Sequence, residues 1–171
     1  MSSSLDLMCK EKIMYRIGFS EDIHPVITGR KLMLGGIEIP APFGLDGHSD
    51  ADVVLHSVCE SILGALALGD LGSHFPDSDP KYKGIASSIL VKEVVKLMEE
   101  KGYKIGNIDI QIACASPKLA PHVLAMRRNI ASLLKTEIDN VSVKAMSFNK
   151  VGAIGKGEAI RSQAVTLLIK N

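Results

Sequence analysis

The 171-residue sequence is poor in the features that mark several common classes of protein. It has no tryptophan, and aromatic residues make up only 4% of it, so we expect no aromatic platform for stacking nucleic-acid bases. Its formal net charge is +1, which gives no reason to expect binding to nucleic acid or to an anionic membrane.

Cysteine is also scarce. The three cysteines, Cys9, Cys59 and Cys114, lie far apart, their number is odd, and no CxxC motif occurs. Structural disulfides are therefore not expected, and a reducing compartment is favoured.

Long apolar runs are missing as well. No stretch approaches the roughly 20 apolar residues that a membrane-spanning helix needs, and residues 1–12 lack the pattern of a signal peptide. We expect a cytoplasmic protein with a frayed tail over residues 1–12 and a single domain over residues 13–171. A chain of this length, with 46% hydrophobic residues, can bury a sizeable core.

The hydrophobic pattern predicts an α+β fold. Strands are expected over residues 13–19, 105–113, 141–146 and 164–169, and a hairpin over 31–39 turns at Gly35-Gly36. Helices are expected from about residue 52, capped by Ser49 or Asp50, over residues 86–101, and from Pro117 to residue 134. We therefore predict a mixed four-stranded sheet plus the hairpin, with the helices packed on one face.

Two polar clusters, Asp22-Ile23-His24 and residues 48–56, suggest a metal site. Asp22 and His24 are two residues apart, so on an extended segment their side chains point the same way, and His56 can join them from a helix. Two imidazoles and one carboxylate leave one position open on a tetrahedral zinc ion, as in catalytic sites. Asp52 or Glu60, one helical turn from His56, could then hold the second nitrogen of a ligand histidine.

Simpler interpretations of these motifs stay open. An Asp-x-His pair arises by chance, and a single helical histidine is usually a core or surface residue. Lys118, expected in the first turn of a helix, suits either a phosphate site or plain solvation. The glycine-rich residues 150–157 are too irregular for a P-loop but could expose backbone amides to an anion.

Longer segments, taken in order, resemble one known family. They are Arg16-Ile17-Gly18, Asp22-Ile23-His24, Gly35-Gly36-Ile37-Glu38-Ile39-Pro40, Gly47-His48-Ser49-Asp50-Ala51-Asp52-Val53, His56, Leu68-Gly69-Asp70-Leu71-Gly72, Phe75-Pro76-Asp77-Ser78-Asp79-Pro80, Lys101-Gly102-Tyr103, Asn107-Ile108-Asp109, Pro117-Lys118 and Val143-Lys144-Ala145. Over about residues 13–170 the chain is similar to the 2-C-methyl-D-erythritol 2,4-cyclodiphosphate synthases of the non-mevalonate isoprenoid pathway.

The resemblance implies a metal-dependent lyase. Such an enzyme converts 4-diphosphocytidyl-2-C-methyl-D-erythritol 2-phosphate to the 2,4-cyclodiphosphate and releases CMP. It implies a homotrimer with active sites at the subunit interfaces, zinc, a second cation (Mg²⁺ or Mn²⁺), and an axial cavity that can bind an isoprenoid diphosphate.

The resemblance also implies roles for individual residues. The zinc ligands fall on Asp22, His24 and His56, and the catalytic positions fall on His48 and Ser147. The substrate-binding positions fall on Asp22, His24, His48, Ser49, Asp70, Leu71, Gly72, Phe75, Asp77, Asp79, Cys114, Pro117, Lys118, Ala120, Met146, Ser147, Asn149, Ala153 and Lys156.

Four positions depart from the family's usual pattern. Asn149 stands where a glutamate usually binds the second cation, so we expect weaker anchoring of that ion by the protein. Met146, Glu60 and Lys156 replace a usual Thr, Asp and Arg, and the lysine puts binding in the axial cavity in doubt. Two other functions are considered, a zinc-dependent phosphoester hydrolase and a trimeric binding protein without activity.

Overall fold

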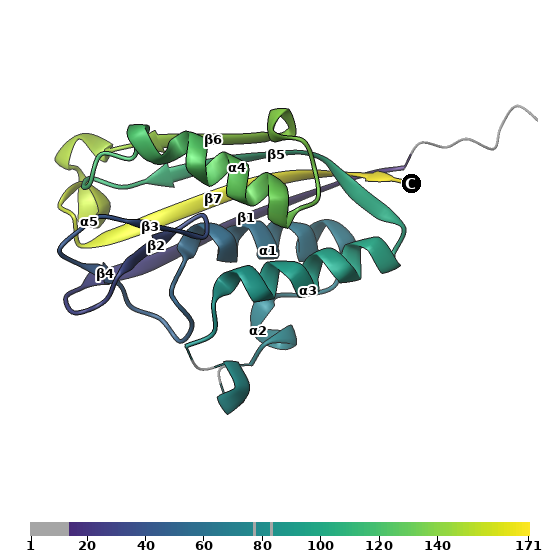
Figure 1. Cartoon of the computed structure of the whole chain (residues 1–171), viewed down its shortest axis with the longest axis horizontal. Helices are drawn as coiled ribbons and strands as arrows, with labels where there is room; N and C mark the ends of the chain where they lie inside the picture. Colours follow the sequence, from purple (N-terminus) through teal and green to yellow (C-terminus); the bar gives the residue numbers. More distant parts are fainter. Residues whose placement is uncertain (1–13, 77, 83) are drawn as a thin grey trace, which may run out of the picture.

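The computed structural model describes residues 14–76, 78–82 and 84–171, so the tail expected over residues 1–12 lies outside it. Its main feature is a five-stranded mixed sheet in the order β4-β1-β7-β5-β6, in which only β5 and β6 are parallel neighbours (Figure 1). These strands are β1 (Tyr15–Ile27), β4 (Gly44–Leu45), β5 (Tyr103–Ala113), β6 (Val141–Met146) and β7 (Ala159–Lys170). The hairpin pairs β2 (Leu32–Leu34) with β3 (Ile37–Ile39).

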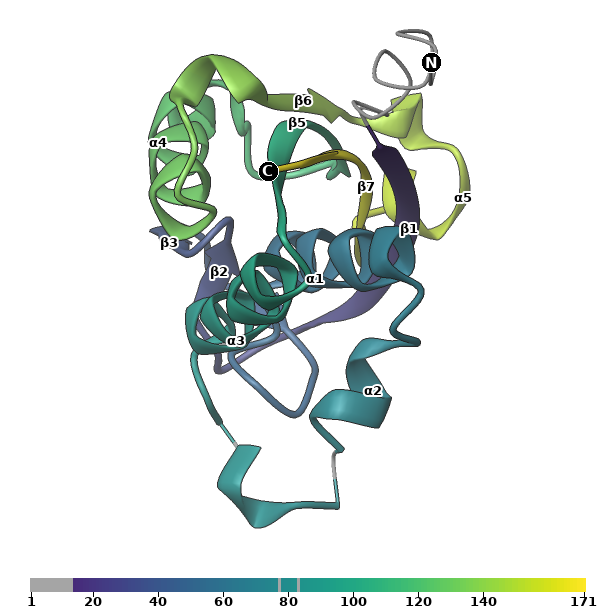
Figure 2. The ribbon, with the colours of Figure 1, turned by 90° about the vertical axis from the view of Figure 1, so that its right-hand side faces the viewer.

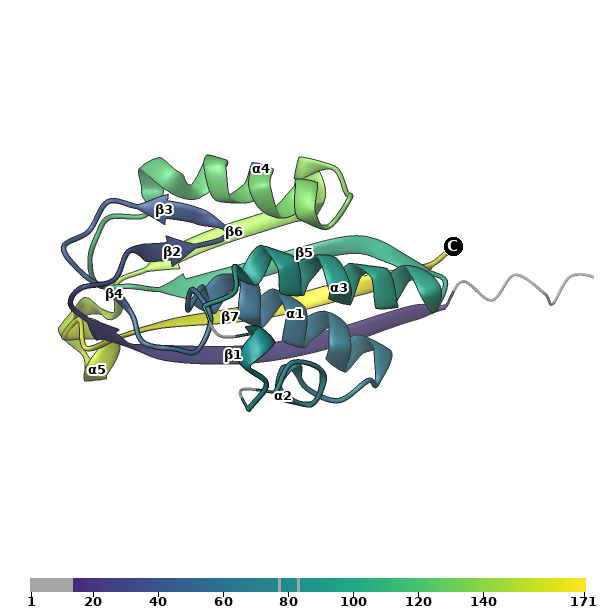
Figure 3. The ribbon, with the colours of Figure 1, turned by 60° about the horizontal axis from the view of Figure 1, so that its bottom comes forward.

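Three long helices cover one face of the sheet (Figure 2). They are α1 (Val53–Leu66), α3 (Ser87–Glu100) and α4 (Val123–Leu133), and α1 packs on β1 and β7 while α4 packs on β6. Short helical segments occur in the connections: α2 (Leu71–His74), α5 (Gly152–Gly155), η1 (Pro80–Tyr82), η2 (Ala120–His122), η3 (Ile138–Asn140) and η4 (Phe148–Lys150). Figure 3 shows α1 and α3 side by side in front of the sheet, with α2 beyond them. Among the described residues, no helix is long and apolar enough to cross a membrane.

The α+β class, the mixed sheet and the helices on one face are confirmed, but the prediction of four strands in the sheet is wrong. β4 adds a fifth strand, because Gly44 and Leu45 pair with the end of β1. β1 itself continues to Ile27 instead of ending before Asp22, since β7 pairs with it from Tyr15↔Ile169 to Pro25↔Ala159. Polar residues that locally resemble a loop are thus held in a strand by the neighbouring strand.

The third helix starts later than predicted. Residues 117–119 are not helical, and α4 begins at Val123 after the short turn η2. Pro121 explains the position, because proline is tolerated in the first turn of a helix but not in its interior. Lys118 therefore precedes the helix and does not lie in its first turn.

Helix α1 lies unusually close to the sheet because the facing residues are small. A Cβ atom on Gly18 would lie 1.8 Å from the Ser61 carbonyl oxygen, so only glycine fits there. Buried hydroxyls pair across the same contact, Ser57 with Ser162 at 2.7 Å and Ser61 with Thr166 at 2.6 Å. Each hydroxyl thus keeps a partner away from water, which makes the close approach tolerable.

None of the helices that the structure describes covers the other face of the sheet, which is rich in apolar side chains. On β1 and β7 these are Ile17, Phe19, Ile23 and Val165, of which Ile17 is 72% exposed and Phe19 62% exposed. Residues on this face alternate along β1 with those that face α1. A row of large exposed apolar groups on one sheet face is typical of a protein–protein interface.

We predict that Gly18→Ala destabilises the protein by about 1–3 kcal/mol, because the new methyl group forces α1 away from the sheet. Gly64→Ala, on the exposed side of the same helix, is the matched control. Its Cβ would meet only the Phe19 carbonyl oxygen, at 3.9 Å. That change should raise stability by about 0.5–1 kcal/mol through helix propensity. Urea unfolding at one protein concentration measures both, and equal effects of the two changes would contradict the packing argument.

Candidate metal centre

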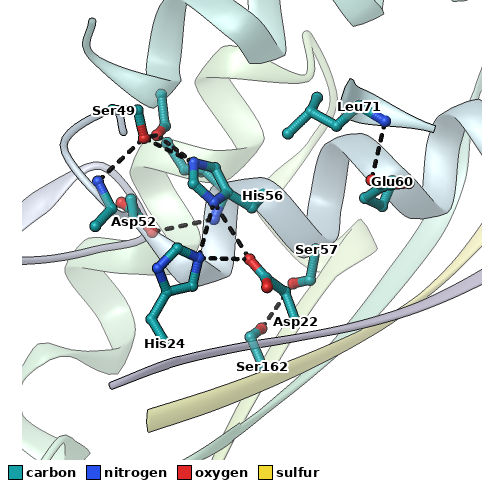
Figure 4. A network of polar contacts seen from close by, with 12 residues as sticks. Asp22, His24, Ser49, Asp52, His56, Ser57, Glu60, Leu71 and Ser162 are labelled. Carbon is teal, nitrogen blue, oxygen red and sulfur yellow. Dashed lines mark hydrogen bonds and ion pairs between the residues drawn. The ribbon is translucent and has the colours of Figure 1, made fainter. Parts of the chain in front are cut away.

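Strand β1 supplies the first two residues of the candidate centre. Asp22 pairs with Ser162 and His24 with Ile160, two positions further along the same strand. The side chains of Asp22 and His24 both point towards α1, as their spacing on a strand predicts (Figure 4). The Oδ1 atom of Asp22 accepts a hydrogen bond from the backbone N–H of Ile23 at 2.8 Å, which fixes the orientation of the carboxylate.

Helix α1 supplies His56 from its first turn. The N-cap of this helix is Asp52, and not Ser49 or Asp50 as predicted. The fully buried Asp52 carboxylate accepts the N–H groups of Val54 and Leu55 and also those of Gly35 and Gly36 in the β2–β3 turn. It joins the start of α1 to the hairpin, and so fixes the place where His56 leaves the helix.

Three possible ligand atoms converge between these two elements (Figure 4). The Asp22 Oδ2 atom lies 3.0 Å from His24 Nε2 and 3.2 Å from His56 Nδ1, and the two nitrogens are 3.3 Å apart. A tetrahedral zinc ion with bonds of about 2.0–2.1 Å holds its ligand atoms about 3.3 Å from one another. The three atoms therefore form a triangle close to one face of a zinc coordination tetrahedron.

The electrostatics of the triad favour a positive charge at its centre. Burial raises the pKa of the Asp22 carboxyl, but hydrogen bonds from His24 and His56 outweigh this and hold the pKa well below its usual range. Burial likewise lowers the pKa of His24, but contacts with Asp22 and Asp46 leave that pKa above its ordinary value. A proton or a metal cation can supply the charge.

The hydrogen bond of His24 Nδ1, the ring nitrogen that faces away from the triad, indicates that Nε2 is free to bind a metal. His24 Nδ1 forms a short hydrogen bond with the backbone carbonyl of Asp46. A carbonyl only accepts, so Nδ1 carries the proton, and in the neutral ring the Nε2 lone pair faces Asp22 and His56. This donor set, two imidazoles and one carboxylate with side chains 12–28% exposed, fits zinc and leaves access from one side.

The groups around the outer nitrogen of His56 differ from the prediction. Neither Asp52 nor Glu60 contacts it, because Asp52 caps the helix and Glu60 accepts the N–H of Leu71 at 2.9 Å. His56 Nε2 instead lies 2.9 Å from the Ser49 hydroxyl and 3.0 Å from the Ser87 hydroxyl. Ser49 lies in the loop before α1 and Ser87 is the first residue of α3, positions that sequence spacing from His56 does not reveal.

A pocket of about 390 Å³ opens above the triad. Of the residues expected at the site, its walls contain Asp22, His24, His48, Ser49, His56, Leu71, Gly72 and Phe75. Sequence reasoning missed an apolar wall formed by Tyr82, Ile85 and Leu90. Ile85 and Leu90 flank the start of α3, where an apolar residue is ordinarily read as core, so the sequence held no signal for them.

The other expected site residues do not line this pocket. Asp70 is exposed and caps α2 through Ser73, Asp79 accepts the N–H of Lys81, and Asp77 lies outside the described residues. A second group lies at the end of β6 and in the segments that follow β5 and β6: Cys114, Pro117, Lys118, Ala120, Met146, Ser147, Asn149, Ala153 and Lys156. In one chain, the pocket therefore brings together only the part of the expected site that surrounds the triad.

The segment after β6 has an unusual backbone. Phe148, Asn149 and Lys150 have φ angles of 59°, 47° and 66°, which are rare for residues other than glycine. The Arg161 guanidinium lies 5.0 Å from the centre of the Phe148 ring and steadies the turn. Backbone outliers of this kind gather at functional sites.

Comparison with known proteins places these observations in a family. The pattern of the YgbB family matches residues 15–169. The 2-C-methyl-D-erythritol 2,4-cyclodiphosphate synthase of Desulfitobacterium hafniense is 54% identical over 157 residues, which is 92% of this chain and 99% of that protein.

Solved structures of the same family have a similar fold. The CDP complex of IspF from Plasmodium falciparum has a TM-score of 0.81 and 34% identity, over 92% of this chain and 97% of that one. The bifunctional IspDF of Campylobacter jejuni has a TM-score of 0.90 and 36% identity over 94% of this chain, which spans only 43% of that longer protein. The chain belongs to the YgbB family, the family of the 2-C-methyl-D-erythritol 2,4-cyclodiphosphate synthases.

Proposed function

We propose that this protein is a cyclodiphosphate synthase. It converts 4-diphosphocytidyl-2-C-methyl-D-erythritol 2-phosphate to 2-C-methyl-D-erythritol 2,4-cyclodiphosphate and releases CMP, a step of non-mevalonate isoprenoid biosynthesis. The observation that carries the proposal is the convergence of Asp22, His24 and His56 below an open pocket, in a chain 54% identical to a named synthase.

The reaction is an intramolecular phosphoryl transfer. An oxygen of the substrate's 2-phosphate forms a bond to the β-phosphorus, and the bond from that phosphorus to the oxygen of the α-phosphate breaks, so CMP leaves with the electron pair. Because nucleophile and leaving group belong to one molecule, the protein needs no nucleophile of its own. Its work is to hold the two phosphates in line and to balance their charge.

Asp22, His24 and His56 would hold the zinc ion, which as a Lewis acid polarises a phosphoryl oxygen. His48 and Ser49, in the loop that borders the pocket, would orient the erythritol phosphate. Leu71, Gly72 and Phe75 line the pocket where the methylerythritol part would lie, and Asp70, Asp77 and Asp79 are near them in the sequence.

The residues beyond β5 and β6 would hold the nucleotide and its diphosphate. We assign Cys114, Pro117, Lys118 and Ala120 to the cytidine part, and Met146 and Ser147 to the diphosphate, with the Ser147 hydroxyl assisting the transition state. Ala153 and Lys156 follow in the same region. A second cation, Mg²⁺ or Mn²⁺, would be held chiefly by substrate phosphates, because Asn149 brings no charge.

A homotrimer would unite the two groups of residues. The proposal is supported by the uncovered apolar face around Ile17 and Phe19, and by the absence of the nucleotide segments from the pocket of a single chain among the described residues. Burying such a face in an oligomer removes apolar area from water. An axial cavity for an isoprenoid diphosphate would lie within this assembly, with Lys156 as the cation in place of arginine.

Other functions have less support. The comparisons give none to a zinc-dependent phosphoester hydrolase, although the same metal could activate water. The argument for an inactive binding protein rests only on Asn149 and Met146, while Asp22, His24 and His56 converge as a working centre requires. We place the protein in the cytoplasm, in keeping with the free thiols of Cys59 and Cys114.

His56→Ala should abolish both zinc binding and release of CMP while leaving a folded protein, because it removes one of three ligands. Metal analysis, circular dichroism and a phosphorus NMR assay on the cytidine-diphospho substrate measure this. A variant that retains one zinc per chain would contradict the ligand assignment. In the unaltered enzyme, a ring-opened product would point to hydrolysis and overturn the proposed function.

Asn149→Glu should strengthen the response to Mg²⁺, because a carboxylate adds a charged ligand that the amide lacks. We expect half-maximal activity at a Mg²⁺ concentration several-fold lower than for the unaltered enzyme, at fixed zinc. Asn149→Gln, which lengthens the side chain without adding charge, is the control. An unchanged Mg²⁺ titration for Asn149→Glu would remove this residue from the second metal site.

Mixing two inactive variants tests whether the site is shared between copies. His56→Ala lacks the zinc site and Ser147→Ala lacks the proposed hydroxyl, so neither trimer alone should turn over at an appreciable rate. If His56 and Ser147 of one site come from different copies, random exchange restores about a quarter of the sites. Activity that stays at the level of the separate variants, after exchange is verified by native mass spectrometry, would show that each site lies within one chain.

A further inference from the structure

The side of His56 that faces away from the triad makes contacts for which the proposed reaction gives no reason. We infer that Asp50, acting through the Ser87 hydroxyl, is a positioning residue that fixes the tautomer of His56. This keeps the Nδ1 lone pair directed at the metal. The inference rests on the proposed metal site and assigns a role to two residues that neither belong to the triad nor line the pocket above it.

The contacts form a short chain from His56 into the protein. His56 Nε2 lies 3.0 Å from Ser87 Oγ, which lies 2.5 Å from Asp50 Oδ1. Asp50 Oδ2 accepts the backbone N–H of Ser87 at 3.1 Å, so the carboxylate accepts two hydrogen bonds from Ser87, one from its hydroxyl and one from its backbone. The Ser49 hydroxyl, which Figure 4 shows beside the His56 ring, lies 2.9 Å from the same nitrogen.

The direction of each hydrogen bond follows from what each group can do. An ionised carboxylate only accepts, so the single Ser87 hydroxyl proton points at Asp50. The Ser87 oxygen then has only lone pairs to offer His56, and His56 Nε2 must carry the proton. In the neutral ring Nδ1 is left unprotonated, 3.2 Å from Asp22 Oδ2 and 3.3 Å from His24 Nε2.

Ser49 alone would not impose this choice. Its oxygen accepts the N–H of Ala51 at 3.1 Å, and its own proton can turn either towards His56 or towards Ser87, 3.3 Å away. A hydroxyl that can donate or accept is compatible with both tautomers of His56. The group that selects the tautomer is therefore the carboxylate of Asp50, because it takes the Ser87 hydroxyl proton and leaves Ser87 able only to accept from His56.

The hydroxyls of Ser49 and Ser87 are shielded from water, and backbone hydrogen bonds hold their segments in place. Ser87 is fully buried and Ser49 is 6% exposed, so water has little access to the outer nitrogen of His56. The loop that carries Ser49 and the segment that leads into Ser87 are joined by the Gly84 N–H to the His48 carbonyl at 2.8 Å and by the Asp50 N–H to the Ile85 carbonyl at 3.0 Å. Buried polar chains with every member satisfied give a fixed geometry.

In both histidines of the proposed site, the ring nitrogen that faces away from the metal position donates a hydrogen bond, but the acceptors differ. His24 donates its outer N–H to a backbone carbonyl, that of Asp46, and His56 donates to a serine oriented by a carboxylate. Groups that orient a ligand histidine commonly affect metal affinity by about 10–100-fold. Only the His56 arrangement depends on side chains, so it alone can be removed by substitution.

Asp50→Asn is the sharpest test. Its amide N–H₂ can donate to Ser87, which frees the Ser87 proton to point at His56 Nε2 and favours the tautomer that blocks the metal. We expect the dissociation constant for zinc, measured by competition with a chelator, to rise about 10–100-fold. Ser87→Ala should have a smaller effect, because Ser49 still accepts from His56.

Asp46→Asn is the matched control. Asp46 is an exposed residue of the same loop and contacts His24 only through its backbone carbonyl, so the change removes one nearby charge and leaves the chain of contacts intact. An equal loss of zinc affinity in Asp46→Asn and Asp50→Asn would reduce the effect to charge and overturn the inference. So would full additivity of Asp50→Asn and Ser87→Ala, since residues that act through one another are not additive.

Nitrogen-15 NMR of the zinc-free protein in mildly alkaline buffer separates this inference from the proposed function. Unaltered protein and Asp46→Asn should show the His56 proton on Nε2, and Asp50→Asn should show it partly or wholly on Nδ1. A proton on Nδ1 in the unaltered protein would overturn the inference even if zinc binds and the enzyme turns over. Failure of the unaltered protein to bind zinc would instead overturn the proposed metal site, and the inference with it.

Discussion

The close contact of α1 with β1 and β7 is the constraint on which the rest of the site depends. Gly18 lets the helix backbone approach the strand, and the Ser57–Ser162 and Ser61–Thr166 pairs keep every buried hydroxyl bonded. His56 extends from the same helix and must meet Asp22 and His24 on the same strand. A larger side chain in this contact would raise the helix and widen the triangle of ligand atoms, because strand and helix are both stiff.

A metal centre also needs its ligands to face inwards, and here each imidazole is fixed from its outer side. The Asp46 carbonyl holds His24, and the hydroxyls of Ser49 and Ser87 hold His56. The loop that carries Ser49 also borders the pocket, through Gly47, His48 and Ser49 itself. The metal site and the proposed phosphate-binding loop are thus parts of one hydrogen-bonded unit, so a change in one is transmitted to the other.

The two faces of the sheet have different surroundings in the single chain. The face under α1, α3 and α4 holds the core and the metal ligands, and the opposite face carries exposed Ile17 and Phe19 in the single chain. Burial of that face between copies would explain both its composition and the distance of the Lys118 and Ser147 segments from the pocket. An enzyme whose site spans two copies is active only when assembled, which ties its catalytic competence to its concentration.

Short-range patterns in the sequence predicted the local features: the Gly35-Gly36 hairpin, the amphipathic helices, and the candidate metal ligands Asp22, His24 and His56. The long motifs carried the family. The sequence did not reveal that residues 20–27 extend β1, because that polar segment becomes a strand only through its pairing with β7 and, at its end, with β4. Nor could it assign the outer contacts of His56. Asp52 lies one turn away in sequence but is occupied by four backbone N–H groups, whereas Ser87, 31 residues further along the chain, reaches the ring. Hydrogen-bond partners of buried groups are decided by which loops the tertiary structure brings together, because each donor and acceptor there has to be satisfied once water is excluded.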